Sequence, residues 1–345
     1  SLPRVIVRTL SRELILRTPN EETFAVLSYA GAEPVMIDRK LVPVELPVEA
    51  RGKFYRLQPP GRGAIEGSAD AILNGVFRLL GAWMSEDSRE TPMLHAAVVS
   101  FDGARLAFLG DKGFGKTTLM LRLIEEGGTV EGDEHLVVMP GGAVTRPRRL
   151  HVKESSLPLV PALADAIRAS PSTMDWMGSR VFACVPSLRG GRWEIAEQPI
   201  DHLIFTEPNF GGASILSSIS PDAAFARMIE TAFMPSQGRG RAAALLRTLC
   251  ATARAWRLQL GRLDQAVWHL RKIRDLGECP TSTRGLVMSE KRIDDLLRKV
   301  PVSRRGAIKT LLAAGFAVPV VASFPMDGRF EIDKALAQAT NGSSS

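Results

Sequence analysis

The sequence predicts an α/β protein with a small β-rich lobe at its N-terminus and a helical or disordered tail at its C-terminus. An apolar run, Leu106–Leu109, leads into a glycine-rich loop and then into a helical pattern. Short β-like runs broken by Pro and Gly fill the N-terminal part, and the composition changes after the last predicted helix. We therefore divide the chain into a lobe of β-strands with one helix (1–88), an α/β domain (89–279), and a linker and tail (280–345).

Composition and charge limit the class of protein. Of the 345 residues, 45% are hydrophobic and 23% are charged, as in ordinary soluble globular proteins. The net charge of +7 suits anionic partners such as a nucleotide or an acidic peptide. Lys and Arg are scattered and no nucleic-acid motif is present, so we do not expect a nucleic acid partner. Three cysteines, Cys184, Cys250 and Cys279, form neither a metal pattern nor a disulfide framework. With no secretory signal in the opening residues, we expect a cytoplasmic protein.

Short apolar runs bounded by polar residues, Pro or Gly predict the strands. In chain order they are Val5–Val7, Phe24–Leu27, Val35–Ile37, Leu94–Val99, Arg105–Leu109, Trp193–Ile195, Ile200–Phe205 and Arg257–Leu260. Apolar residues at 3.6-residue spacing predict the helices. They are a stripe from Ile65 to Trp83, the helix after the glycine-rich loop, Leu159–Ile167, Pro221 to about Phe233 with Ser220 as its cap, Arg241–Ala255 and Asp264–Ile273.

The glycine-rich loop fits the pattern G-x-x-x-x-G-K-[ST] without a mismatch. A buried strand precedes it, and a helix follows it and ends at Gly127-Gly128. Glycines let backbone N–H groups close around a phosphate, and the helix N-terminus adds a partial positive charge. We expect Lys116 to reach the terminal phosphates and the hydroxyl of Thr117 to bind Mg²⁺. The predicted phosphate-binding residues are Gly110, Asp111, Lys112, Gly113, Phe114, Gly115, Lys116, Thr117 and Thr118.

Two acidic residues, Asp133 and Glu134, follow the loop helix. In a strand beside the strand of the loop, such carboxylates would hold Mg²⁺ or activate a nucleophile. An exposed acidic turn is the alternative. His95, on the strand before the loop, is either structural or placed to assist proton movement beside Asp133.

A family resemblance rests on four segments. Leu94–Ala97, Leu109–Thr117, Glu125–Gly128 and Gly132–Glu134 resemble the core of the HPr kinase/phosphorylase family, and most closely its HPr-kinase-related branch, found beside peptide-modification genes in bacteria. The resemblance is strongest over about residues 90–155 and extends to 275. It implies a P-loop core of the HPr-kinase/PEP-carboxykinase type.

The same resemblance implies the roles of the site residues. Asp133 would be the base for a serine hydroxyl, with His95 supporting it and Lys116 on the phosphates of ATP. Thr117, Glu134 and Asp133 would serve the Mg²⁺ ion. The family usually has Asp where this chain has Glu134, and it has small residues where this chain has Lys112 and Phe114.

We therefore expect an ATP- and Mg²⁺-dependent serine kinase that acts on a small protein or peptide. The signature of the reverse, phosphorylase direction is missing, since Ser187–Gly191 keeps little beyond Arg-Gly, so we expect kinase activity alone. Arg189, Arg148 and Lys153 are expected to be solvated. A nucleotide-binding regulator without phosphotransfer is the alternative. A phosphoenolpyruvate-carboxykinase-like enzyme would need a metal-binding His/Lys/Asp set that the sequence does not supply. The substrate, the oligomeric state (a homo-oligomer included) and the donor (ATP or pyrophosphate) stay open.

The tail resembles a separate small peptide. Ser303-Arg304-Arg305 precedes an uncharged segment, Thr310–Met326, in the manner of a twin-arginine signal. That segment is shorter than the roughly 20 residues of a membrane span and contains Pro319. The tail is either an appendage, packed or mobile, or a substrate of the kinase in cis or in trans. Related kinases of lasso-peptide gene clusters modify a C-terminal serine, and this chain ends in Ser343-Ser344-Ser345.

Overall fold

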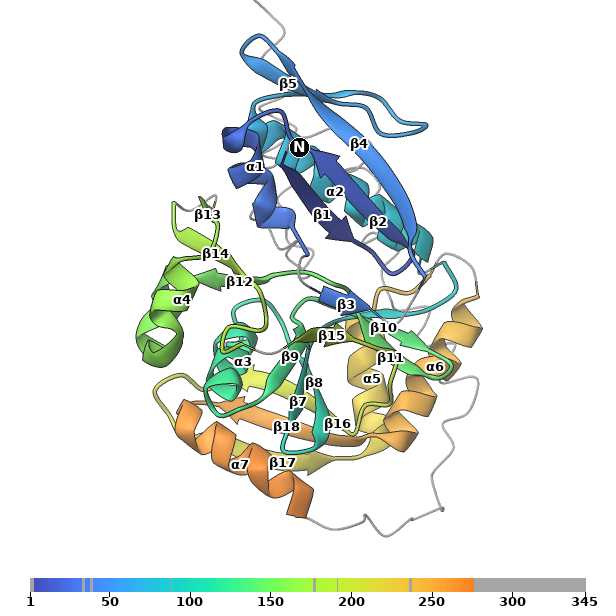
Figure 1. Ribbon diagram of the computed structural model, residues 1–345. Coiled ribbons are helices and arrows are strands. Elements are labelled where there is room, and N and C mark those ends of the chain that lie inside the picture. The colour runs from blue at the N-terminus through green and yellow to red at the C-terminus, as the bar shows by residue number, and fades with distance from the viewer. Residues whose placement is uncertain are drawn as a thin grey trace, which may run out of the picture.

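A computed structural model describes residues 3–275, apart from 33–34, 38–39, 88, 176–177, 191 and 236–237. The tail expectations, including the twin-arginine-like segment and the C-terminal serines, lie outside the described residues. Within them the chain is a mixed α/β structure with several sheets (Figure 1). None of the helices described there combines the length and apolarity needed to cross a membrane.

The largest sheet has eight strands and carries the glycine-rich loop. Its order is β11-β10-β7-β8-β16-β18-β17, and β9 also pairs with β7. The strands are β7 (Met93–Phe101), β8 (Ala104–Leu109), β9 (Thr129–Gly132), β10 (His135–Met139), β11 (Gly142–Thr145), β16 (His202–Pro208), β17 (Ile215–Ile219) and β18 (Arg254–Leu260). β8, β16 and β18 run parallel, whereas β7 is antiparallel to β8. The strands predicted at Leu94–Val99 and Arg105–Leu109 are confirmed as parts of β7 and β8, which form a hairpin.

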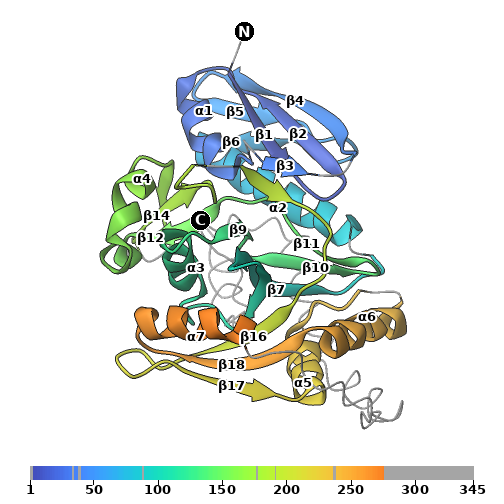
Figure 2. The same ribbon diagram turned by 60° about the horizontal axis from the view of Figure 1, so that its bottom comes forward.

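Helices cover both faces of this sheet (Figures 1 and 2). On one face α3 (Lys116–Glu125) and α7 (Leu263–Asp275) share a core with Leu106 and Phe108 of β8. On the other, α5 (Pro221–Thr231) and α6 (Arg239–Thr252) pack on its alternate residues, Ala107 and Leu109. Because β8 is buried on both faces, its sequence is an uninterrupted apolar run.

A three-stranded sheet lies beside α3. It has the order β12-β14-β13, with β12 (Leu150–Lys153), β13 (Ser172–Met174) and β14 (Arg180–Cys184). The helix predicted over Leu159–Ile167 is broken into η2 (Glu154–Leu159), η3 (Pro161–Leu163) and α4 (Ala164–Arg168). Pro158 and Pro161 explain the break, because proline has no backbone N–H and cannot continue an α-helix.

The N-terminal lobe is a five-stranded sheet backed by one long helix, α2 (Ala69–Asp87). Its strands are β1 (Arg4–Arg8), β2 (Arg12–Arg17), β4 (Val42–Arg51), β5 (Phe54–Leu57) and β6 (Ile65–Gly67). The strand predicted at Phe24–Leu27 is wrong, since these residues belong to helix α1 (Glu21–Leu27), which the short 3-10 helix η1 (Ser28–Ala30) follows. The side chain of Asn20 accepts a hydrogen bond from the backbone N–H of Thr23 at 2.9 Å and caps this helix.

One strand of the N-terminal segment joins the following domain. β3 (Val35–Ile37) pairs in parallel with β15 (Trp193–Ile195). The indole of Trp193 is fully buried, and its Nε1 donates to the carbonyl oxygen of Glu131 at 2.8 Å. Figure 2 shows β3 at the junction between the lobe and the larger sheet. The lobe is therefore tied to the domain by backbone pairing as well as by side chains.

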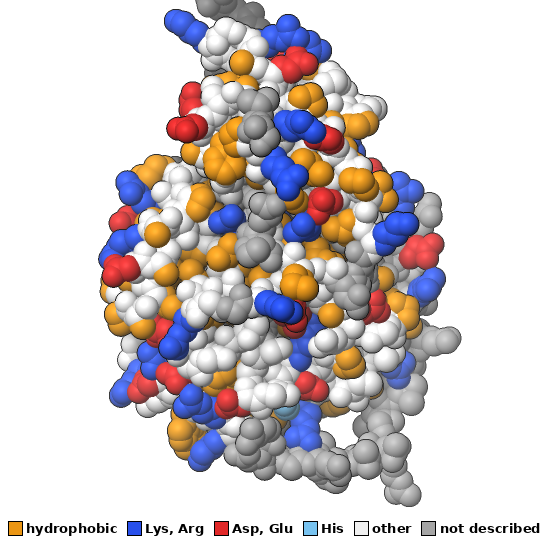
Figure 3. All heavy atoms as spheres, viewed as in Figure 1, with side chains coloured by type: hydrophobic (Ala, Val, Ile, Leu, Met, Phe, Trp, Pro, Cys, Tyr) orange, Lys and Arg blue, Asp and Glu red, His pale blue; other side chains and the backbone are white. Residues whose placement is uncertain are grey.

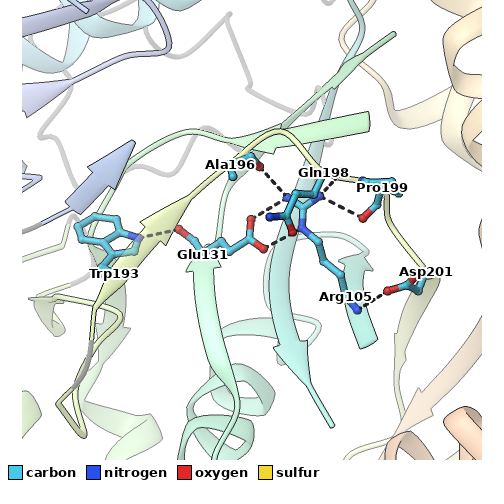
Figure 4. Close-up of polar contacts among 7 residues, drawn as sticks. All are labelled: Arg105, Glu131, Trp193, Ala196, Gln198, Pro199 and Asp201. Carbon is cyan, nitrogen blue, oxygen red and sulfur yellow. Dashed lines mark hydrogen bonds and ion pairs between the residues drawn. The ribbon is translucent and has the colours of Figure 1, made fainter. Parts of the chain in front are cut away.

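A buried ion pair links β8, β9 and the chain leading into β16 (Figure 4). Nε and Nη2 of Arg105 each donate to one carboxylate oxygen of Glu131, both at 2.7 Å. The guanidinium also donates to the carbonyl oxygens of Gln198 and Pro199. In the pairing of β9 with β7, Gly132 lies opposite Val98 and Val130 lies opposite Val99, so Glu131 is the extra residue of a β-bulge.

We expect Glu131→Gln to lower the free energy of unfolding by about 3–5 kcal/mol, because it leaves the buried guanidinium of Arg105 without its counter-charge. Urea unfolding would measure this. The matched control is Glu90→Gln, which breaks an ion pair with Arg241 whose side chains are 64% and 62% exposed, and it should cost less than about 1 kcal/mol. Equal losses in the two variants would contradict a structural role for the buried pair.

Candidate functional site

The glycine-rich loop connects the end of β8 to the start of α3, as the sequence predicts. Positive φ angles at Gly110 (154°), Gly113 (88°) and Gly115 (82°) turn the backbone in a way that favours glycine. Gly110 also lies against β16. A Cβ atom there would stand 2.4 Å from Oγ1 of Thr206 and 2.8 Å from its carbonyl oxygen.

The first turn of α3 presents free backbone donors. Its N-cap is Gly115, which has no side chain to accept hydrogen bonds from the amides that follow. These N–H groups and the positive end of the helix dipole suit an anion. Thr117 lies in this turn and is half-buried, and the hydroxyl of Thr118 is 3.2 Å from Oγ of Ser156 in η2.

Lys116 is folded back into the loop. Its Nζ donates to the carbonyl oxygens of Gly110 at 2.6 Å and Asp111 at 2.9 Å, and the residue is 6% exposed. Burial lowers the pKa of Lys116 to about 8, while the carboxylates of Asp111 and Asp133 act in the opposite direction. The ammonium group therefore lies within electrostatic reach of both the loop and the acidic pair.

The acidic pair occupies the bend between β9 and β10, both of which pair with β7. The expectation that these carboxylates lie in a strand beside the loop strand is wrong, because β7 separates them from β8. The reason is topological: β7 forms a hairpin with β8, and the chain after α3 returns to the free edge of β7.

Asp133 has a strongly perturbed carboxyl group. Burial raises its pKa to about 6, although Arg148, a hydrogen bond with the backbone of His151, and Lys116 favour the charged form. A carboxylate with a pKa near 6 is ionised at neutral pH and is a better proton acceptor than an ordinary aspartate.

Glu134 is held by an arginine. It is 8% exposed and forms an ion pair with Arg148, and its carbonyl oxygen accepts a hydrogen bond from Ala96 of β7 at 3.3 Å. Arg148 also contacts Nδ1 of His151 at 2.5 Å, and burial lowers its pKa. The expectation of a solvated Arg148 is therefore wrong, because the chain between β11 and β12 carries it inward to the acidic pair.

His95 lies in β7 directly opposite His135 of β10, beside the acidic bend. Burial, together with the positive charges of Lys116, Arg148 and Lys112, lowers the pKa of His95 to about 3. The imidazole is therefore neutral at physiological pH. The structure brings His95, Lys116 and Asp133 into one electrostatically coupled group.

The N-terminal lobe reaches the edge of this group. The ring of Tyr29 stands 4.7 Å from that of His151, and the guanidinium of Arg148 lies 5.7 Å from the ring centroid of Phe77. The hydroxyl of Tyr29 is buried and has no hydrogen-bond partner among the residues that the structure describes, and burial raises its pKa. Sequence reasoning missed Tyr29 and Phe77, because their contact with the site depends on the packing of the lobe and not on a local pattern.

Two other basic residues lie apart from the site. Arg189 is exposed and donates from Nη1 to the carbonyl oxygen of Glu125, at the end of α3 remote from the loop. Lys153 is exposed at the end of β12. The expectation that these two are solvated is confirmed. Figure 3 shows Lys and Arg spread over one face of the molecule and interspersed with Asp and Glu.

The oxygen donors near the loop suit Mg²⁺ only in part. Across residues 3–275, within the described positions, no group of three His, Cys, Asp or Glu side chains is placed to hold a metal ion. Mg²⁺ needs few protein ligands, because substrate phosphates and water complete its shell. Asp133 and the hydroxyl of Thr117 fit that role. Glu134 fits it less well, since its carboxylate is paired with Arg148.

We expect Gly110→Ala to lower the free energy of unfolding by about 1–3 kcal/mol more than Gly113→Ala. Both substitutions place a side chain at positive φ, but only the first drives a Cβ into Thr206, since nothing lies within 4 Å of a Cβ at Gly113. Urea unfolding of the two variants is the measurement. A larger loss for Gly113→Ala would mean that β8 and β16 do not meet as closely as described.

Comparisons with known proteins add little to what the geometry of the site shows. No family model and no curated protein matches the chain. Among solved structures, the Hpr(Ser) kinase/phosphatase from Coxiella burnetii aligns at 11% sequence identity over 54% of this chain and 99% of that one, with a TM-score of 0.27. This TM-score does not demonstrate a common fold.

Proposed function

We propose that the protein is an ATP-dependent kinase that transfers the terminal phosphoryl group to a serine hydroxyl of a small protein or peptide. One observation carries the proposal: the lysine of the glycine-rich loop and a carboxyl group with a raised pKa, Asp133, interact electrostatically in one buried site. A phosphate-holding cation beside a tuned base is the arrangement that phosphoryl transfer to a hydroxyl requires.

The glycine-rich loop supplies the binding half of the mechanism. The uncapped amides of the first turn of α3 would hold the phosphates. Nζ of Lys116 would exchange its two backbone carbonyl partners for phosphate oxygens, which are better acceptors because they are charged. The positively charged surroundings would then stabilise the charge that develops on the transferred group.

Asp133 supplies the chemical half. The serine oxygen attacks the terminal phosphorus, the bond from that phosphorus to the bridging oxygen breaks, and ADP leaves. The hydroxyl proton passes to the carboxylate of Asp133. His95 is neutral and lies in β7 beside the acidic bend, so it would support Asp133 without adding a competing charge.

Mg²⁺, bound through the phosphates with Asp133 and Thr117, would neutralise the charge of the polyphosphate. Glu134 would join that shell only if Arg148 released it. While the ion pair holds, Glu134 keeps Arg148 beside the site of transfer. The proposed role of Arg148 is therefore electrostatic, next to the carboxylate that takes the proton.

The substrate proposal is a serine on a flexible peptide, and the three C-terminal serines of this chain are candidates in cis or in trans. A linked substrate would meet the site at high effective concentration. A nucleotide-binding regulator that transfers no phosphate is the competing function, and it is favoured by the engagement of Glu134 with Arg148 instead of with a metal.

We expect Lys116→Ala to abolish phosphate transfer and to leave the fold intact, because the hydrogen bonds of Nζ go to two carbonyl oxygens of the loop itself. The full chain would be incubated with Mg-ATP, with and without an added serine peptide. Mass spectrometry would locate phosphate, and ADP release would be followed in parallel. Phosphate is expected on the added peptide or on Ser343, Ser344 or Ser345 of the wild type.

The control for this experiment is Lys53→Ala, an exposed lysine in the turn between β4 and β5. It should behave as wild type. ATP binding by the wild type without ADP release or phosphorylation would favour the regulator. Transfer by Lys116→Ala at more than about a tenth of the wild-type rate would contradict the kinase proposal.

We expect Asp133→Asn to retain nucleotide affinity and to reduce the rate of transfer by roughly 10²–10⁴-fold, the usual effect of removing a general base. His95→Ala should have the smaller effect, because a neutral imidazole acts here through Asp133. Single-turnover rates with saturating Mg-ATP would compare the two. If His95→Ala proved the more damaging, the two roles would be reversed.

A further inference from the structure

An exposed aromatic ring lies beside the glycine-rich loop. Phe210 lies two residues beyond the end of β16 and is 64% exposed. Its Cε1 and Cζ atoms lie 3.3 and 3.6 Å from the position that a Cβ on Gly115 would occupy. One edge of the ring therefore touches the loop at the N-cap of α3, while most of its surface is open to solvent.

The segment that carries Phe210 is tightly built. The backbone N–H of Asn209 donates to the carbonyl oxygen of Leu260 at 2.8 Å, and the N–H of Gly212 donates back to Asn209 at 2.8 Å. Nδ2 of Asn209 bonds the carbonyl oxygen of Ala213, also at 2.8 Å. A Cβ on Gly261 would stand only 2.2 Å from the carbonyl oxygen of Gly212. The ring is thus held outward by a fixed turn.

The two ends of the site lie on opposite sides of β8. On the β7 side are the acidic bend and Asp133, which couples to Lys116 and marks where the terminal phosphate must lie for transfer. On the β16 side is Phe210. A polyphosphate that runs across the loop with its terminal group near Asp133 therefore directs its other end toward Phe210.

We propose that Phe210 is the platform on which the nucleobase of the phosphate donor stacks. This inference rests on the proposed function and extends it to the recognition of the donor. The occupant is the base of a nucleoside triphosphate whose phosphates fill the loop. Stacking on an aromatic face tolerates any base, so the contact selects nucleotides over inorganic polyphosphates and not one base over another.

Single exposed aromatic residues are common on protein surfaces. The proposal therefore rests on the position of Phe210 beside the glycine-rich loop and not on its exposure. Phe54 makes the comparison. It is 60% exposed in β5 of the N-terminal lobe, at the far end of the molecule from β16. Figure 1 shows β5 at the top and β16 in the lower part. Phe54 touches no part of the glycine-rich loop and serves as the control.

The test compares a ligand that has a base with one that lacks it. Isothermal titration calorimetry would measure Mg-ATP and Mg-tripolyphosphate binding to the full-length wild type and to Phe210→Ala, Phe210→Trp and Phe54→Ala. We expect Phe210→Ala to weaken ATP binding by roughly 5- to 100-fold and to leave tripolyphosphate binding unchanged. Phe210→Trp should keep or improve ATP affinity, and Phe54→Ala should match the wild type.

Four outcomes would overturn the inference. Unchanged ATP affinity in Phe210→Ala would place the base elsewhere. Equal weakening of both ligands would show that the substitution only distorts the loop. Wild-type binding of tripolyphosphate as tightly as ATP would show that the base adds nothing, while the phosphate site of the proposed function would stand. Failure of the wild type to bind either ligand would instead remove the proposed function, and this inference with it.

Discussion

The position of the acidic bend depends on one buried interaction, the ion pair between Arg105 and Glu131. Side chains alternate across a strand, so a one-residue insertion reverses the face to which every later residue points. Glu131 is that insertion, and it falls two residues before Asp133. A bulge that carries a carboxylate into the interior is stable only if the charge is paired. Arg105 donates a hydrogen bond to each of the two carboxylate oxygens of Glu131. The bulge ends one residue before the acidic bend, so the place where that bend begins is set from β8, the strand that also carries the glycine-rich loop.

The same bulge ties the N-terminal lobe to the site. The carbonyl oxygen of Glu131 accepts the indole N–H of Trp193, and β15, which contains Trp193, pairs with β3 of the N-terminal segment. The lobe in turn places Tyr29 and Phe77 against His151 and Arg148, at the edge of the acidic group. A shift of the lobe would therefore change the surroundings of both the bulge and Arg148, through two separate sets of contacts.

The parts of the structure that depend on local sequence could be predicted, and the parts that depend on distant partners could not. The glycine-rich loop and α3 follow from residue types and spacing within one stretch of chain, and the structure has them where the sequence places them. The helix at Glu21–Leu27 is capped by Asn20, which is a local signal for a helix. The prediction gave more weight to the apolar run Phe24–Leu27 and so assigned a strand there. The position of the acidic pair could not be predicted, because it depends on the order of the strands and on a bulge. The bulge residue pairs with Arg105, which lies 26 residues earlier in the chain. The partial burial of Arg148 depends on packing against the N-terminal lobe, and no local sequence pattern predicts that packing.

The electrostatics of the unliganded site explain why a polyanion fits it. Lys116 is buried and Arg148 is partly buried, and desolvation lowers the pKa of each. Their present partners are backbone carbonyl oxygens for Lys116 and the carboxylate of Glu134 for Arg148. Carbonyl oxygens only partly compensate a buried ammonium ion, whose desolvation is costly.

A phosphate at the helix N-terminus would supply a compensating negative charge and raise the pKa of Lys116 toward its ordinary value. It would also lie next to Asp133, and negative charge there disfavours a second anion, so the carboxylate would bind a proton more readily when the phosphates are in place. Binding of the donor would therefore strengthen the proposed base at the moment when it is needed.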